Sequence, residues 1–386
     1  MTGGEMRAAG ANAALIGAAA GREQLATPCL LLDLAAFQRN LEWMSRHCRE
    51  RGLALRPHAK THKCIEIARR QIAQGAHGIC TVSVGEAEIF VRGGLTDILI
   101  TSPLTTVRKL QRFIAMQGQG ATVAAVVDNL RHCRMLAAMA REANLRVPVY
   151  VDLDLGRHRT GVATAGDLAE LGRFIASQGA LNYAGLQAYS GHLSHVPSFA
   201  ERRAGLEDVK RRVEAAVAVL DAAGLETSVI SGGSTGTCLI DAQAGPVNEA
   251  QFGSYIFMDV EYGAVDLDGA WSRPFEPALF VVCAVASANT PGLATADAGY
   301  KHFGLICDQP RIVSGPEGSG SARFTLNSDE HSRIEFDPAQ CSIAAGDLLT
   351  CWIPHCDPTV NLYDQIHVFD GETLVDIWPV DARGAY

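Results

Sequence analysis

The sequence predicts an α/β chain in which a parallel sheet covered by helices precedes a smaller all-β domain. Short apolar runs alternate with helical patterns between residues 29 and 258, and near-continuous apolar strands are typical of a parallel sheet with helices on its faces. After about Tyr262 the helical periodicity largely disappears, and short apolar runs recur between Gly, Pro and Asp residues. The length of 386 residues favours the same division into one large unit and one smaller domain.

Nine strand-like runs lie in the first part of the chain. They are Cys29–Leu34, Leu53–His58, Gly78–Val84, Asp97–Ser102, Ala121–Asp128, Val147–Asp154, Tyr183–Tyr189, Thr227–Gly232 and Phe252–Met258. Between them, apolar residues recur at helical spacing in Ala35–Arg51, Arg131–Asn144 and Phe199–Ala223. Eight strands would close a TIM barrel, so nine leave two arrangements open: a barrel with one strand outside it, or an open, doubly wound sheet.

The second part of the chain reads as an all-β domain of about 120 residues. Its expected strands are Ala278–Ala286, Phe303–Cys307, Ser332–Phe336, Asp347–Ile353, Gln365–Phe369 and Leu374–Val380.

Composition excludes several classes of partner. The net charge is −9 and there is no basic run, so nucleic acid and acidic membrane surfaces are not expected partners. The 11 cysteines form no CxxC pair, which favours a reducing compartment over a disulfide framework. No apolar run is long enough to span a membrane, and the Ala/Gly-rich stretch from residue 8 to residue 20 is too interrupted for a signal peptide. We therefore expect a soluble, cytoplasmic protein.

Reactive side chains follow several predicted strands, where a barrel carries its chemistry. Lys60 follows the second strand beside Arg56, His58, His62 and Lys63. Like charges disfavour its ammonium form, which would help it act as an amine nucleophile. The alternative is a solvated basic turn.

A Gly- and Ser-rich segment, Ser231–Thr237, follows the eighth strand. Its backbone N–H groups could cradle a phosphate, although such segments are also ordinary turns. A Schiff-base lysine together with a phosphate cradle suggests pyridoxal phosphate.

His355 and Asp357 form a candidate metal site in the β-domain. On a strand these two side chains would point to one face, and imidazole plus carboxylate favours Mn²⁺, Mg²⁺ or Zn²⁺. The alternative is a His/Asp turn before Pro358.

Five segments together resemble fold-type III (alanine racemase-like) pyridoxal-phosphate enzymes, specifically the group of D-threonine aldolases and 3-hydroxy-D-aspartate aldolases, with D-serine dehydratases as close relatives. They are Thr27–Leu34 (TPCLLLDL), Arg56–Lys63 (RPHAKTHK), Gly185–Tyr189 (GLQAY), Gly253–Asp259 (GSYIFMD) and His355–Asp364 (HCDPTVNLYD). The resemblance implies that the first strand pairs with the C-terminal domain. Residues 35–262 would then form a (β/α)8 barrel, and residues 1–34 with 263–386 the β-domain that carries the metal site.

The resemblance also assigns roles to residues. Lys60 would be the Schiff-base lysine, His195 the general base, and His355 with Asp357 the metal ligands. Arg159 and Tyr189 would contact the cofactor or substrate, and the phosphate site would comprise Ser231, Gly232, Gly233, Thr235, Gly236, Gly253, Ser254 and Tyr255. Two positions depart from the pattern: Ser234 replaces a usual glycine, and His192 is a second candidate base.

The implied activity is the cleavage of a D-β-hydroxy amino acid to glycine and an aldehyde by a homodimeric enzyme with pyridoxal phosphate and a divalent metal. A dehydratase acting on D-serine or 3-hydroxyaspartate is the nearest alternative. By the same resemblance, the metal motif of the dehydratases is His-x-Cys, whereas this chain has His355-x-Asp357. A non-catalytic pyridoxal-phosphate-binding protein and a metal-dependent barrel hydrolase are more distant alternatives.

Overall fold

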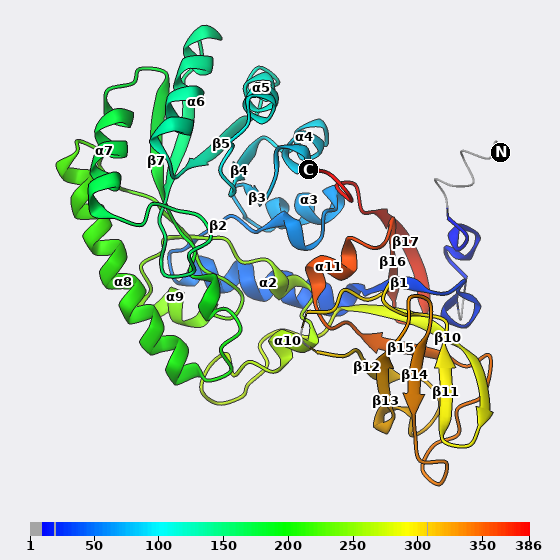
Figure 1. Ribbon diagram of the computed structural model, residues 1–386. Helices are drawn as coiled ribbons and strands as arrows, with labels where there is room; N and C mark the ends of the chain where they lie inside the picture. The colour runs from blue at the N-terminus through cyan, green and yellow to red at the C-terminus, as the bar shows by residue number, and fades with distance from the viewer. Residues whose placement is uncertain (1–9, 19–20, 307) are drawn as a thin grey trace.

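Eight short parallel strands form the wall of a barrel, and a second, mainly antiparallel sheet lies beside it (Figure 1). The computed structural model describes residues 10–18, 21–306 and 308–386. The barrel strands are β2 (Ala54–Leu55), β3 (Ile79–Thr81), β4 (Asp97–Ile100), β5 (Thr122–Val127), β6 (Val147–Asp152), β7 (Leu181–Ala188), β8 (Ile230–Gly232) and β9 (Glu249–Ala250). They follow one another in the order β2-β9-β8-β7-β6-β5-β4-β3.

The sheet closes between its two end strands. His58, three residues beyond β2, forms a parallel bridge with Cys80 of β3, and the Cys80 N–H donates to the carbonyl oxygen of Pro57 at 2.9 Å. The predicted TIM barrel is therefore confirmed, and the open, doubly wound alternative is wrong.

Helices surround the barrel wall and join its strands (Figure 1). They are α2 (Leu34–Glu50), α3 (Ile65–Ala73), α4 (Val84–Arg92), α5 (Val107–Met116), α6 (Leu130–Glu142), α7 (Ala165–Ala176), α8 (Phe199–Ala222), α9 (Cys238–Ala244) and the short α10 (Val260–Gly263). Most begin at a short polar residue, because its side chain accepts a hydrogen bond from an N–H group of the first turn. Asp33, Ser83, Asn129 and Ser198 do so for α2, α4, α6 and α8.

The second sheet has nine strands. They are β1 (Cys29–Asp33), β10 (Leu279–Thr290), β11 (Leu293–Ala296), β12 (Arg311–Ser314), β13 (Arg323–Leu326), β14 (Ser332–Glu335), β15 (Leu348–Trp352), β16 (Gln365–Asp370) and β17 (Thr373–Pro379), with the short helix α11 (Cys356–Val360) after β15. Strand β1 pairs antiparallel with β10 and parallel with β16. The first strand of the chain thus belongs to this sheet, which leaves eight strands for the barrel.

Two predicted strands are wrong. The last barrel strand is Glu249–Ala250 rather than Phe252–Met258, because β9 pairs with β8 and β2 only at these two residues. The apolar run that follows is instead buried in the core between the two sheets. Residues 303–306 form no strand either, and Cys307 lies outside the described residues. Strands β11, β12 and β13, each four residues long, were not predicted.

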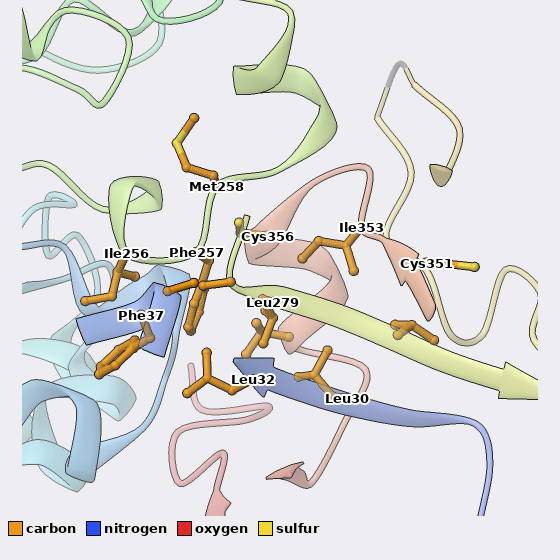
Figure 2. Packing of buried hydrophobic residues seen from close by; sticks show 14 of the residues in the cluster. Leu30, Leu32, Phe37, Ile256, Phe257, Met258, Leu279, Cys351, Ile353 and Cys356 are labelled. Atoms are coloured by element: carbon orange, nitrogen blue, oxygen red, sulfur yellow. The ribbon is translucent and has the colours of Figure 1, made fainter. Parts of the chain in front are cut away.

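One hydrophobic core joins the barrel to the second sheet. It contains Phe37 of α2, Ile256 and Phe257 after β9, and Leu279 and Ile353 of the C-terminal part. Figure 2 shows these side chains converging where α2, β1, β10 and the Ile256–Met258 segment meet. The continuous core fixes the C-terminal domain against the barrel, so residues of both can contribute to one site.

No helix in the described part of the chain is long and apolar enough to cross a membrane. The ten cysteines that the structure describes are all free and buried.

Candidate active site

Lys60 lies on a 3-10 turn, Ala59–Thr61, just beyond the carboxyl end of β2. The His58 ring holds the turn: its Nδ1 accepts from the Lys60 N–H at 3.4 Å, while its Nε2 lies 3.1 Å from the Thr101 hydroxyl oxygen. Burial, and then the charge of Lys60, hold the pKa of His58 well below its ordinary value. A neutral ring suits these two contacts, because Nδ1 must remain an acceptor. The Lys60 side chain, 41% exposed, faces a cavity of about 330 Å³.

The ammonium of Lys60 meets a carboxylate rather than a cluster of cations. Its Nζ lies 3.3 Å from Oδ1 of Asp357, which belongs to the C-terminal domain, and this carboxylate raises the pKa of Lys60. The predicted depression of the pKa by like charges is therefore wrong in this structure. Opposite charge within about 4 Å outweighs the more distant cations.

The neighbouring basic residues point elsewhere. Lys63 is buried and pairs with Glu86 at 2.6 Å. Arg56 is buried inside the barrel, where it pairs with Asp97 at 2.6 Å and Glu249 at 3.0 Å. The two lysines of the segment thus have separate structural surroundings, and only Lys60 lines the cavity.

Most of the other predicted cofactor residues also line this cavity: Arg159, Tyr189, Gly233, Thr235, Gly253 and Ser254. The guanidinium carbon of Arg159 lies 5.5 Å from the centre of the Tyr189 ring, so the two side chains form one wall. Thr235 joins the two Gly-containing segments, since its hydroxyl oxygen accepts from the Tyr255 N–H at 2.9 Å. These residues bring backbone, hydroxyl and guanidinium donors to the cavity that Lys60 also lines.

Four predicted cofactor residues lie behind the cavity rather than on it. The Tyr255 hydroxyl is buried and accepts from the Gln71 amide at 3.1 Å. Ser231 is buried, and its hydroxyl oxygen accepts from the Gln251 amide at 2.9 Å. At Gly232 and Gly236 a Cβ atom would overlap the carbonyl oxygens of Ala188 and Ser194. These two glycines are required by close packing of the protein itself.

A chain of buried amide and carboxyl groups forms the floor of the cavity. Gln251 donates to Ser231, and Gln187 donates to Asp152 Oδ1 at 2.9 Å and to the Thr101 carbonyl at 3.1 Å. Burial raises the pKa of Asp152 to about 6, despite the hydrogen bond from Gln187. Gln251 was missed as a site residue because the last strand was placed at Phe252–Met258, beyond Gln251, rather than at Glu249–Ala250. Its position directly after β9 is the signal that identifies it.

His355 and Asp357 stand at the start of α11, since His355 is the N-cap residue of this helix. The extended conformation assumed for these two side chains is therefore not present, because the chain turns into a helix after Pro354. The side chains still approach each other, with His355 Nε2 and Asp357 Oδ2 at 3.8 Å. Within residues 10–18, 21–306 and 308–386, no group of three or more His, Cys, Asp or Glu side chains is arranged to hold a metal ion.

Two carboxylates that sequence reasoning missed surround His355. Asp259 is fully buried, and its Oδ2 lies 3.2 Å from His355 Nδ1 and accepts from the Cys356 N–H at 2.9 Å. Glu261 Oε2 also lies 3.2 Å from His355 Nδ1. Carboxylates at Nδ1 orient the ring so that Nε2 faces Asp357. Both follow β9 on the segment that contains the matched GSYIFMD motif.

His195 lies in the loop after β7 and reaches the same cluster. Its ring centre is 4.4 Å from that of Tyr262 and 5.9 Å from that of His355, and its Nδ1 is 3.7 Å from Glu261 Oε2. Burial lowers the pKa of His195. His192 is exposed as His195 is, and its pKa is lowered first by partial burial and then by Arg157. The ring contacts with Tyr262 and His355 are made by His195. Of the two candidate bases, the structure places His195 with Lys60 and His355.

The barrel, the lysine after β2 and the attached β-domain define an enzyme of the alanine racemase type. Two family models match the chain: the N-terminal domain of alanine racemase over residues 32–261, and a serine dehydratase domain over residues 278–369. The chain belongs to the alanine racemase-like family, in the group of D-threonine aldolases and 3-hydroxy-D-aspartate aldolases. This family comprises pyridoxal-phosphate aldolases and dehydratases, which are lyases.

Three relatives cover nearly the whole chain. A D-threonine aldolase from Arthrobacter sp. is 37% identical over 361 residues, 93% of both chains. A 3-hydroxy-D-aspartate aldolase from Paracoccus denitrificans (strain Pd 1222) is 35% identical over 366 residues, 94% of this chain and 93% of the relative. The crystal structure of D-threonine aldolase from Filomicrobium marinum superposes with a TM-score of 0.89 at 34% identity, covering 94% of this chain and 97% of that structure.

Proposed function

We propose that this protein is an aldolase that cleaves D-β-hydroxy amino acids of the D-threonine type to glycine and an aldehyde, with pyridoxal phosphate and a divalent metal ion. The observation that carries the proposal is a chain of contacts that begins at Lys60 on the cavity wall. It runs through Asp357 and His355 to His195. The two curated aldolases support the same activity, since each is at least 35% identical over more than nine-tenths of the chain.

The cavity fits pyridoxal phosphate by the chemistry of its walls. Lys60 supplies the amine for the aldehyde carbon, and Arg159 with Tyr189 forms a cationic and aromatic wall suited to a flat ring. Gly233 has φ of +79° and lines the cavity, so its backbone can face a phosphate that the Thr235 and Ser254 hydroxyls also reach. When bound, the cofactor supplies an electron sink for the bond that breaks at Cα.

The His355/Asp357 pair fits a divalent cation with open positions. It offers one imidazole nitrogen and one carboxylate, and the nearby Asp259 would keep the proton of His355 on Nδ1. His355 and Asp357 would hold the cation, whose charge would polarise the β-hydroxyl of the substrate and lower the pKa of that hydroxyl. Two protein ligands leave space for water and that hydroxyl.

His195 is the proposed general base for the β-hydroxyl proton. Because burial lowers its pKa, the ring is neutral near pH 7 and can accept a proton. Glu261 lies nearest to Nδ1, which leaves Nε2 as the accepting atom. The His195 ring centre lies 5.9 Å from that of His355, so His195 would act on the substrate beside the proposed metal ligands.

A dehydratase acting on D-serine or 3-hydroxyaspartate is the second candidate, favoured by the match of residues 278–369 to a serine dehydratase domain. The metal motif of this chain is His355-x-Asp357, whereas that of the dehydratases is His-x-Cys. This difference supports the aldolase activity. Product identification separates them, since an aldolase forms glycine and an aldehyde, whereas a dehydratase forms a keto acid and ammonia. We also propose that the enzyme acts as a homodimer, which sedimentation of the purified protein tests.

A further inference from the structure

Arg202 is a completely buried arginine in the first turn of α8. Its guanidinium donates only to main-chain carbonyl oxygens: Nη1 to Val196 at 2.5 Å and to Pro197 at 3.0 Å, and Nη2 to Asp266. Among the residues that the structure describes, no carboxylate forms a direct ion pair with it. Burial lowers the pKa of Arg202, and the charge of Asp266 opposes this effect only in part. The planar fork of donors thus joins two loops that are far apart in the sequence.

Burying the Arg202 guanidinium costs free energy, and filling the space between the two loops would not by itself need a charged side chain. A buried guanidinium loses its hydration, and a carboxylate partner is the usual compensation. Here the compensation comes from the carbonyls and from the Phe199 ring, whose centre lies 5.9 Å from the guanidinium carbon. An apolar side chain could fill the same space but could not hold the two loops together.

The first of these loops carries His195 and the second follows Tyr262. Val196 and Pro197 come directly after His195, and the Asp266 N–H donates to the same Pro197 carbonyl oxygen at 3.0 Å. The Arg202 bridge therefore closes the loop against the segment whose Tyr262 ring packs on His195.

The other side of the His195 loop is fixed by close packing. The Ser194 carbonyl oxygen occupies the space that a side chain at Gly236 would need, and Leu193 packs against Gly205 of α8. The backbone before His195 is held by these contacts of Leu193 and Ser194. The position of the His195 ring then depends on the backbone of residues 195–197. Those are the residues that Arg202 holds.

We propose that Arg202 is a positioning residue that holds the His195 ring in its place beside Tyr262 and His355. The inference rests on the proposed function, in which His195 is the general base. It predicts that loss of the fork lowers the rate of the proton transfer to His195 while leaving the binding of pyridoxal phosphate and Mn²⁺ unchanged, since neither Lys60 nor Asp357 contacts Arg202.

A double-mutant cycle on the metal-loaded holoenzyme tests this role. Arg202→Met should lower kcat for glycine formation from D-threonine by about 10- to 100-fold, as expected for a displaced catalytic group, with KM and the visible absorbance of bound cofactor within about twofold of wild type. In a His195→Ala background the same substitution should change kcat by less than about twofold, because the group that it positions is absent. Arg203→Met, at the exposed neighbouring position, is the matched control and should leave kcat unchanged.

Arg202→Lys keeps one charged donor but loses the fork, so it should recover only part of the rate. If the methionine variant does not fold, the lysine variant takes its place in the cycle. An equal loss of kcat in the wild-type and His195→Ala backgrounds would overturn the inference alone. A wild-type enzyme that forms no glycine, or a fully active His195→Ala enzyme, would instead overturn the proposed function and with it this role of Arg202.

Discussion

Lys60 Nζ lies 3.3 Å from Asp357 Oδ1, so a lysine of the barrel and a carboxylate of the C-terminal domain meet across the domain boundary. Thr61 reaches the same carboxylate, with its hydroxyl 3.4 Å from Oδ2. Because the two domains share one hydrophobic core (Figure 2), this contact is held by packing on both sides. The amine and the proposed metal ligand are therefore placed to act on one small substrate.

Removal of the Lys60 amine should eliminate the covalent attachment of pyridoxal phosphate. In Lys60→Ala the visible absorption band of the lysine-bound cofactor should disappear, and borohydride reduction of wild type should label the peptide that contains residue 60. Lys109→Ala, at an exposed position, should keep the band. An unchanged spectrum in Lys60→Ala with cofactor bound would contradict the assignment.

Asp357→Asn should weaken the binding of the metal without removing the lysine that binds the cofactor. The substitution keeps the shape of the side chain but removes its charge, and we expect Mn²⁺ affinity to fall by more than about 100-fold, since even outer-shell partners of metal ligands contribute about 10- to 100-fold. Titration calorimetry with Mn²⁺ measures the effect. Asp364→Asn, whose exposed carboxylate pairs with Arg383, is the control. Equal Mn²⁺ affinity in Asp357→Asn and wild type would exclude this residue as a ligand.

The two histidines after β7 should differ in their effect on the rate. His195→Ala should lower kcat by about 10²- to 10⁴-fold, the usual contribution of a general base. His192→Ala should remain within about twofold of wild type, because the ring that contacts Tyr262 and His355 is that of His195. Steady-state kinetics on both variants distinguishes them, and the reverse order would make His192 the base.

The barrel interior should show a pH-dependent contribution to stability from Glu249. Burial would raise the pKa of this carboxyl, but His77 at 2.8 Å and Arg56 at 3.0 Å outweigh it and hold the pKa at about 2. Since the folded-state pKa lies below the unfolded value of about 4.3, the stabilisation is present above pH 4.3 and is lost as the pH falls toward 2. The difference corresponds to about 3 kcal/mol.

Glu249→Gln should therefore lower the free energy of unfolding at pH 7 by about 3 kcal/mol, because it leaves the buried Arg56 with one carboxylate fewer. Urea unfolding of both proteins at pH 7 and near pH 3 measures this, and the gap between them should narrow at the lower pH. A gap that is the same at both pH values would contradict the ion-pair explanation.

The sequence pattern predicted a parallel sheet covered by helices and a lysine at the end of one of its strands, and the reasons are physical. Buried parallel strands produce continuous apolar runs, and Lys60 follows such a run directly. The pattern failed at Phe252–Met258, since apolar residues in a core between domains look like those in a strand. It also could not show that Asp357 lies beside Lys60, because 297 positions separate them and only tertiary packing brings them together. For the same reason Asp259, Glu261 and Gln251 were found only in the structure.

Product analysis with D-threonine tests the central claim most directly. The enzyme loaded with pyridoxal phosphate and Mn²⁺ is incubated with D-threonine, and glycine, acetaldehyde, 2-oxobutanoate and ammonia are quantified together. The account predicts equal amounts of glycine and acetaldehyde, loss of both in excess chelator, and recovery when Mn²⁺ is added back. Formation of 2-oxobutanoate and ammonia in place of glycine, or undiminished glycine formation in the chelator, would contradict it.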